Sequence, residues 1–355
     1  MRVGRVIFVL GNLELGGAER QALILARYLS EREQADVEIW GFNRSGPVAD
    51  ICEQHGIKWR VVPCELRKVA RLLRHARPDI LLPYTSIPNV VCGLVRQRTG
   101  ARLCVWNQRD EGIFSLDAKW QHRAADRTLQ FISNSHGGAR YLIEKLNVDP
   151  AKVRVIPNGI EVLPPQFDRR KWRKRLEIDE KSFVACMVAN LHANKDHETL
   201  LRAWRIVVQA KPDAVLVLAG RHYGAYESLL DLTNESGITG NVRFAGQVTD
   251  VAGVLSAVDL GVFSSRSEGC PNGVLECMAA GLAVVGTDTT GIRETGIRFL
   301  VPPGNAEDFA QIVIELANDP ALCGTIGAAN QSTIKERYNA KRMCEDTVAL
   351  LKHEH

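Results

Sequence analysis

The sequence predicts an α/β protein made of two Rossmann-like domains in tandem, and three observations support this. Short apolar runs alternate with amphipathic helical patterns along the whole chain. The runs are apolar on both faces, which is typical of parallel strands covered by helices on either side. The 355 residues exceed a usual single core, and the pattern restarts after a proline-rich segment at 153–168.

The first half begins with an uninterrupted apolar strand at 5–10, followed by an amphipathic helix at 17–30. A helix at 64–79 is expected to stop near Pro78, because proline cannot continue a helix. Further strands are expected at 36–42, 80–84, 102–108 and 130–135.

The second half repeats this alternation without a close repeat of sequence. Strands are expected at 182–191, 214–220, 241–246, 259–265 and 283–288. Helices are expected at 198–211, 223–237 and 272–281, with helical patterns near 306–318 and 340–352.

Composition excludes several classes of protein. A net charge of +4 is too small for a globally basic surface. The nine cysteines include no C-x-x-C pair, which argues against a disulfide framework and a zinc site and fits a reducing cytosol. No stretch reaches the eighteen apolar residues of a membrane helix, and the run at 6–10 is too short for a signal-peptide core. We therefore expect a cytoplasmic protein, with peripheral membrane contact left open.

The loop after the first strand, GNLELGGAER at 11–20, is a candidate ligand site. It lacks the Lys and Ser/Thr of an NTPase phosphate loop and the G-x-G-x-x-G of a dinucleotide fold. The chain is therefore expected to be neither an NTPase nor a nicotinamide dehydrogenase. Gly16 and Gly17 either let a ligand approach the N–H groups that open the helix, or form a tight strand–helix turn.

The segment SEGCPNGVLECMAAG at 267–281 places a carboxylate on each side of a helix start. Free N–H groups at the start of a helix favour a bound phosphate. Glu276 suits two neighbouring hydroxyls, as on a ribose, and Glu268 suits hydroxyls of a sugar or a second substrate. The alternative is that Glu276 complements the helix dipole and Glu268 is solvated. The N–H donors would come from around Gly273, Val274 and Leu275, with Asn272 as a further candidate in the turn before them.

The segment SRSEGCPNGVLECMAAGLAVVGTDTTGIRE resembles the E-x7-E signature of the retaining glycosyltransferases of family 4, which adopt the GT-B fold. Similar segments extend along nearly the whole chain: LELGGAER, SNSHGGARYL, VRVIPNGIE, VANLHANKDHETLLRAW and NVRFAGQVTDVAGVLSAVDLGVFSS. The resemblance implies two Rossmann-like domains that face each other across a cleft. It places an acceptor-side domain at 1–161 and a nucleotide-sugar domain at 162–334, with a final helix at about 335–355 packing back on the first domain.

The chain departs from the family pattern at charged positions. The family commonly uses an Arg and a Lys to hold the donor diphosphate. Here Lys195 matches, Asn190 stands at the Arg position, and His192 replaces an Arg that some relatives have two residues later. A histidine is neutral over part of the physiological pH range, unlike arginine. Many members also have an N-domain His facing the reacting sugar, whereas this chain has Asn107, Arg109 and Asp110 in that segment.

The resemblance implies a metal-independent, retaining hexosyltransferase that uses a UDP- or GDP-sugar and a glycan or lipid-linked acceptor. Glu268 and Lys195 would be catalytic, with Lys195 stabilising the departing diphosphate. No metal-ligand cluster fits the site, and neither a cofactor nor nucleic acid is expected. Two alternatives stay open, a nucleotide-sugar epimerase of similar fold and a homologue that binds nucleotide-sugars without turnover.

Two basic segments bear on membrane contact. RRKWRKR at 169–175 carries six basic residues around Trp172 and is open to anionic lipid or nucleic acid. The 65–77 helix is basic and amphipathic, a pattern that can lie on the inner face of a membrane. Simpler interpretations are a solvated helix face for the first segment and a helix packed on the sheet for the second. The basic residues of the second segment include Arg67, Lys68, Arg71 and Arg74.

Overall fold

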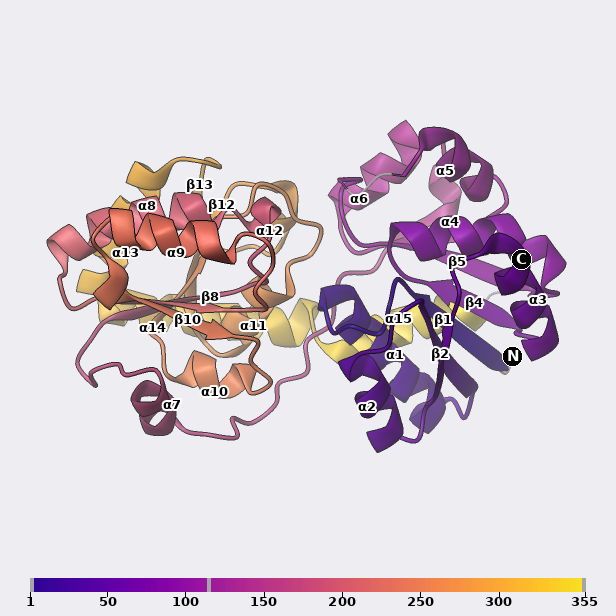
Figure 1. Cartoon of the computed structure of the whole chain (residues 1–355), viewed down its shortest axis with the longest axis horizontal. Helices are drawn as coiled ribbons and strands as arrows, with labels where there is room; N and C mark the ends of the chain where they lie inside the picture. Colours follow the sequence, from indigo (N-terminus) through magenta and orange to yellow (C-terminus); the bar gives the residue numbers. More distant parts are fainter. Residues whose placement is uncertain (1–2, 114–115, 353–355) are drawn as a thin grey trace. The chain divides into compact units, whose positions relative to one another are not determined.

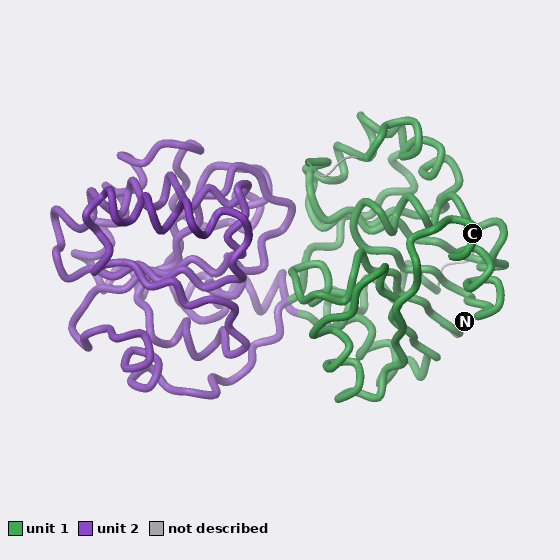
Figure 2. Tube along the Cα trace, in the orientation of Figure 1, with its two compact units in different colours: residues 1–159, 340–355 green, residues 160–339 purple. Residues whose placement is uncertain are grey.

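The protein consists of two compact units. The structure, a computed structural model, describes residues 3–113 and 116–352. Unit 1 comprises Met1–Gly159 together with Ala340–His355, and unit 2 comprises Ile160–Asn339 (Figure 2).

Unit 1 is built on a parallel sheet with the strand order β3-β2-β1-β4-β5-β6-β7. The chain adds strands first on one side of β1 and then on the other, which is the doubly wound arrangement of Rossmann-like folds. The strands are β1 (Arg5–Leu10), β2 (Asp36–Phe42), β3 (Lys58–Val62), β4 (Ile80–Pro83), β5 (Leu103–Gln108), β6 (Gln130–Ser133) and β7 (Val153–Val155).

The sheet of unit 1 is buried on both faces, as its apolar strands predicted. In β1, Phe8 and Leu10 enter one hydrophobic cluster, whereas Ile7 and Val9 enter another. Alternate residues of a strand point to opposite faces, so both faces need helices over them. The helices are α1 (Gly17–Arg32), α2 (Pro47–Gln54), α3 (Leu66–Ala76), α4 (Ser86–Val95), α5 (Ala118–Ala125) and α6 (His136–Arg140) (Figure 1).

The last helix, α15 (Ala340–Lys352), belongs to the core of unit 1 although the rest of that unit ends at Gly159. Met343, Val348 and Leu351 are buried in the same hydrophobic cluster as the apolar face of α1. The intervening residues, Ile160–Asn339, all belong to unit 2.

Unit 2 repeats the architecture with the strand order β10-β9-β8-β11-β12-β13, again entirely parallel in its registered pairs. The chain reverses the direction of strand addition between β8 and β11. The strands are β8 (Val184–Val188), β9 (Val215–Ala219), β10 (Val242–Gly246), β11 (Leu260–Phe263), β12 (Ala283–Thr287) and β13 (Phe299–Val301).

Helices cover both faces of the unit 2 sheet, and Figure 1 shows α8, α9 and α13 on one face and α10 and α11 on the other. The fold class predicted from the sequence, two Rossmann-like domains, is therefore confirmed. The helices are α7 (Arg169–Arg175), α8 (His197–Ala210), α9 (Tyr226–Glu235), α10 (Val251–Ser256), α11 (Asn272–Ala279), α12 (Thr290–Glu294), α13 (Ala306–Asn318) and α14 (Pro320–Arg337).

Some elements differ from the prediction. The proline-rich segment expected to be a link contributes β7 to the unit 1 sheet before it leaves that unit. The basic run at 169–175 forms α7, but it is not a fully solvated face, because Trp172 and Arg173 are buried. The Arg173 guanidinium donates to backbone carbonyls and to Asp259, so this arginine serves the fold. A lipid or nucleic-acid surface on α7 would lack both residues.

Candidate active site

The carboxyl ends of β8 and β11 form the switch point of the unit 2 sheet, where ligands bind in open parallel sheets. Lys195 lies in the turn that follows β8, and Glu268 lies in the loop that follows β11. The Lys195 ammonium nitrogen is 2.5 Å from Oε1 of Glu268. The structure therefore brings together the two residues that the sequence singled out as catalytic.

This ion pair is substantially shielded from water. The side chain of Glu268 is 9% exposed and that of Lys195 is 26% exposed. A carboxylate buried to this degree needs partners for its charge, and the ammonium supplies one. An ammonium carries three N–H donors, so Lys195 can keep this bond and still donate to a ligand.

Two buried serines at the end of β11 hold the pair in place. The Ser265 hydroxyl donates to Oε1 of Glu268 at 2.6 Å, and the Ser264 hydroxyl donates to the backbone carbonyl of Lys195 at 3.0 Å. Both serines have no exposed surface. Oε1 of Glu268 thus accepts from two donors, whereas none of the described residues donates to Oε2. The second oxygen is the one available to a ligand.

The loops that carry the pair are also joined to each other. The Asn194 side-chain amide donates to the carbonyl of Ser267 at 2.8 Å, and the Arg266 N–H donates to the carbonyl of Asn194 at 2.9 Å. Because both bonds link the turn after β8 to the loop after β11, the geometry of Lys195 and Glu268 is preorganised.

The start of α11 lies over the end of β8. A Cβ on Gly273 would come within 2.2 Å of the Val188 carbonyl oxygen, so glycine is required for this close approach. Pro271, at the N-cap position, makes no side-chain cap hydrogen bond to the helix. The first N–H groups of a helix lack partners within it, so those of the first turn can bind an anion.

The expectation that the Leu275 N–H donates to a bound phosphate needs correction. Its N–H already donates to the carbonyl of Pro271 at 3.2 Å, and its side chain is fully buried, as is that of Val274. The N–H groups of Gly273 and Val274 stay candidates for a phosphate, and Asn272 stays a proposed contact in the turn before them. Glu276, one turn into the helix, is half-buried.

Asn190 and His192 follow β8 and shape the loop. Oδ1 of Asn190 accepts from the N–H of Arg221 at 3.0 Å, and Nδ1 of His192 accepts from the N–H of Asn194 at 3.2 Å. His192 therefore caps the turn that carries Lys195, and a neutral His192 has its proton on Nε2. Neither residue supplies the permanent charge of an arginine.

His197 begins α8 directly behind Lys195 and is 3% exposed. Burial, together with the nearby Lys195 ammonium, lowers the pKa of His197 to about 4. The imidazole is thus neutral near pH 7 and adds no positive charge that would compete with Lys195.

The glycine loop of unit 1 follows β1, at the corresponding switch point beside β4. Gly16 precedes α1 at the N-cap position and makes no side-chain cap hydrogen bond. Gly17 is exposed at the first position of the helix. Both interpretations made from the sequence, a tight strand–helix turn and close approach of a ligand to the backbone, fit this arrangement.

The three acceptor-side candidates take different positions at the carboxyl end of β5. Asn107 is 1% exposed, and its amide donates to the carbonyls of Pro83 and Val105. The Arg109 guanidinium lies 4.5 Å from the centre of the Tyr84 ring and donates to Asn158 at 3.1 Å. Asn107 therefore braces neighbouring strands, and Arg109 is the more accessible of the two.

Asp110 is held by three donors. Its Oδ1 accepts from the Gly112 N–H at 2.6 Å and from the Gln108 side chain at 3.0 Å. Burial raises the pKa of this carboxyl, opposed by donation from Gly112, Ile113 and Gln108. The side chain is therefore fixed by its own loop.

Sequence reasoning missed Ser264 and Ser265, and it missed Tyr84 and Asn158 in unit 1. A signal was present in each case, since each residue directly follows a strand or lies within three residues of its end. Without contacts, however, nothing distinguished these residues from other polar residues at strand ends.

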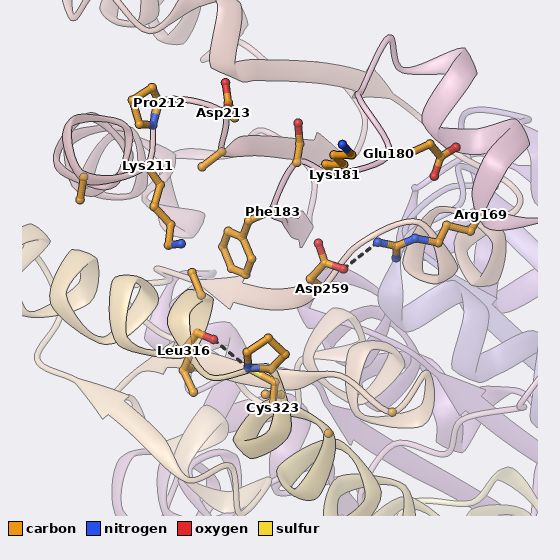
Figure 3. Close-up of a pocket in the computed structure, with 18 residues that line it drawn as sticks. Arg169, Glu180, Lys181, Phe183, Lys211, Pro212, Asp213, Asp259, Leu316 and Cys323 are labelled. Carbon is orange, nitrogen blue, oxygen red and sulfur yellow. Dashed lines mark hydrogen bonds and ion pairs between the residues drawn. The ribbon is translucent and has the colours of Figure 1, made fainter.

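A separate pocket of about 720 Å³ lies at the opposite, amino ends of the unit 2 strands. Figure 3 shows Lys211 reaching into it alongside Phe183, with Asp259 engaged by Arg169 at 2.8 Å. Its basic side chains are Arg169, Lys181 and Lys211, and they are matched by Glu180, Asp213 and Asp259. The lining therefore has no net charge for an ionic ligand, and the pocket is remote from the switch point.

The described residues contain no group of three or more His, Cys, Asp or Glu side chains arranged to hold a metal ion. None of the described helices combines the length and apolar character needed to cross a bilayer. Basic α3 packs on the sheet through Val69, Ala70 and Leu73, as its simpler interpretation predicted, and exposes Arg71 and Arg74.

Comparison with known proteins gives the family. Residues 15–162 match a family model described as Glycosyltransferase Family 4, and residues 182–319 match a model described as Glycosyl transferases group 1. Together the two models span most of the chain. The chain belongs to glycosyltransferase family 4. The resemblance read from the sequence is thereby confirmed.

Two relatives of this glycosyltransferase act on different substrates. One is the UDP-Gal:alpha-D-GlcNAc-diphosphoundecaprenol alpha-1,3-galactosyltransferase of Escherichia coli, 23% identical, with 87% of this chain and 86% of the relative covered. Another is the GDP-mannose-dependent monoacylated alpha-(1-6)-phosphatidylinositol monomannoside mannosyltransferase of Corynebacterium glutamicum, 26% identical over 216 residues. The second match spans 56% of each protein, about half of either chain.

A solved structure gives the fold independently. Anabaena Alr3699/HepE in complex with UDP and glucose has a TM-score of 0.88 and 20% identity, with 98% of this chain and 99% of that chain covered. This likeness confirms that the glycosyltransferase has the GT-B fold predicted for it.

Proposed function

We propose that the protein transfers a hexose from a nucleotide-diphospho-sugar to a glycan or lipid-linked acceptor, with retention of anomeric configuration. The observation that carries this proposal is the Lys195–Glu268 ion pair beside the start of α11, at the switch point of unit 2. Cation, carboxylate and helix N–H groups in one place suit a ligand with a charged middle and hydroxyls at its ends.

Each end of the donor has a proposed partner. Lys195 and the first N–H groups of α11 hold the diphosphate, and Oε2 of Glu268 accepts from hydroxyls of the transferred sugar. Glu276 accepts from the ribose hydroxyls, with Asn190 and His192 shaping the loop beside the phosphates. Because the diphosphate gains charge as the bond to C1 breaks, Lys195 stabilises the transition state more than the ground state.

The protein supplies the positive charge for the leaving group in this proposal, without a metal or a cofactor. The bond between C1 and the phosphate oxygen breaks, and the acceptor oxygen bonds to C1 on the same face. The acceptor's proton passes to the departing phosphate. Gly16 and Gly17 are proposed contacts of the donor. Arg109 and Asp110 are the proposed acceptor contacts, with Asn107 orienting Arg109.

Relatives support a nucleotide-sugar donor and a lipid-linked acceptor. The two described above use, by name, UDP-galactose with a diphosphoundecaprenol-linked sugar and GDP-mannose with a phosphatidylinositol mannoside. An enzyme with such an acceptor works at a membrane surface. We propose peripheral contact of exposed basic residues of α3 with the cytoplasmic leaflet, whose anionic lipids attract them.

A panel of UDP- and GDP-hexoses tests the proposal. Purified protein should slowly hydrolyse one donor, releasing nucleoside diphosphate and free sugar, and proton NMR should show the sugar first as the anomer present in the donor. The matched variant Glu268→Gln should bind that donor but release sugar far more slowly. Recovery of epimerised donor, or binding of a donor with no release, would contradict a transferase.

A further inference from the structure

The loop after β9 presents an exposed aromatic ring beside the proposed donor site. Tyr223 is 46% exposed. The Arg221 guanidinium lies 6.0 Å from the centre of its ring, and the His192 ring meets it edge-on at 6.2 Å with an interplanar angle of 80°. We call His192, Arg221 and Tyr223 the Tyr223 platform.

The platform is fixed to the loop that leads to Lys195. The Arg221 N–H donates to Oδ1 of Asn190 at 3.0 Å, and the Leu191 N–H donates to the carbonyl of Arg221 at 3.0 Å. Gly220 allows this contact, because a Cβ there would come within 1.9 Å of the Ala189 carbonyl oxygen. The ring is therefore carried on a braced turn at the carboxyl edge of the sheet.

The order of strands gives the ligand that the platform suits. Lys195 and the start of α11 mark the middle of the edge, at β8 and β11. Glu268 lies on the side of β12, since α12 packs against it: a Cβ on Gly291 would come within 2.3 Å of the Glu268 carbonyl oxygen. A donor with its diphosphate at Lys195 and its sugar at Glu268 must extend its other end toward β9.

We infer that Tyr223, flanked by Arg221 and His192, is the surface on which the nucleobase of the donor stacks. This rests on the proposed function, which requires a nucleotide-sugar. A nucleobase is flat and has a π-face that stacks on an aromatic ring, and a neighbouring guanidinium adds a cation–π contribution. Stacking is tolerant of base identity, so the platform contributes affinity for uracil and guanine nucleotides alike.

Calorimetry with UDP, GDP and inorganic diphosphate tests the inference. Tyr223→Ala should weaken UDP and GDP binding by about tenfold, the size of one lost stacking contact. It should leave binding of inorganic diphosphate unchanged, since that ligand has no base. Tyr223→Phe keeps the ring and should bind within about twofold of the unmodified protein. Phe167→Ala is the control, because it removes another exposed aromatic ring of unit 2, 41% exposed and packed on Trp172. It should change the affinity for neither UDP nor GDP.

The outcomes separate this inference from the proposed function. If the unmodified protein binds UDP or GDP and Tyr223→Ala binds them equally well, the nucleobase stacks elsewhere and the inference is wrong. An equal loss for inorganic diphosphate would also overturn it, because the substitution would then act on the phosphate site. A loss confined to the intact nucleotide-sugar, with UDP and GDP unaffected, would assign Tyr223 to the sugar. If the unmodified protein binds neither nucleotide, the proposed function itself fails.

Discussion

Replacing Ser265 with alanine removes one hydroxyl from a fully buried position without changing the backbone. That hydroxyl donates to Oε1 of Glu268 at 2.6 Å, and Lys195 donates to the same oxygen. A hydrogen bond to a charged group contributes about 1.5–3 kcal/mol. If that energy serves to hold Glu268 in its reactive geometry, turnover should fall by about 10- to 150-fold, since each 1.36 kcal/mol is a factor of ten in rate.

The assay compares turnover with binding. Donor hydrolysis gives kcat, calorimetry gives the affinity for nucleoside diphosphate, and thermal unfolding controls for the fold. Because the diphosphate is assigned to Lys195 and α11, Ser265→Ala should lower kcat and leave that affinity nearly unchanged. Ser256→Ala is a matched control, since its hydroxyl donates to the Gly253 carbonyl on α10 at 2.7 Å, away from Glu268. Equal kcat values for the two variants would refute a positioning role for Ser265.

Further outcomes are expected at other sites. Glu276→Gln should weaken nucleoside diphosphate binding by about 1.5–3 kcal/mol, and unchanged affinity by calorimetry would rule out its ribose contact. In flotation assays the protein should rise with anionic vesicles at low salt but not at high salt. Replacing Arg67, Lys68, Arg71 and Arg74 with Gln should abolish binding to the vesicles. If the protein floats under none of these conditions, a soluble acceptor is the better proposal. His197, with a pKa of about 4 in the fold and 6.5 as its ordinary value, stays neutral where the unfolded chain is protonated. The free energy of unfolding should therefore fall between pH 6.5 and 4, by at most about 3 kcal/mol, and His197→Leu should flatten that slope relative to the unmodified protein.

Sequence pattern was sufficient for the fold because buried parallel strands carry a strong signal. Runs such as 5–10 and 215–219 are apolar on both faces, so the sequence alone predicts that they are buried. The strands that escaped prediction lie at sheet edges or are short. In β3, four of the five residues are at least partly exposed, and β7 has three residues, so neither has the apolar run that marks a central strand.

The site was predictable in its charged residues but not in their supports. Glu268 and Lys195 stood out by residue type and motif, and both follow strands that meet at the switch point. The Ser264 hydroxyl donates to the Lys195 carbonyl on another loop, and the Ser265 hydroxyl donates to Glu268 three residues further along its own loop. The residue types alone do not show that either hydroxyl makes its bond. The Leu275 N–H was wrongly expected to bind a phosphate. It donates to the carbonyl of Pro271 instead, because the backbone is already helical at the first turn of α11.

The central claim is that Lys195 and Glu268 form the catalytic pair of a nucleotide-sugar transferase. Its most direct test is nucleoside diphosphate release at saturating donor by the unmodified protein and by Lys195→Ala. Removing a charge aimed at the leaving group costs about 10²- to 10³-fold in kcat in comparable sites. We predict steady release by the unmodified protein and a loss of that size in the variant. Equal kcat values for the two proteins would contradict the account.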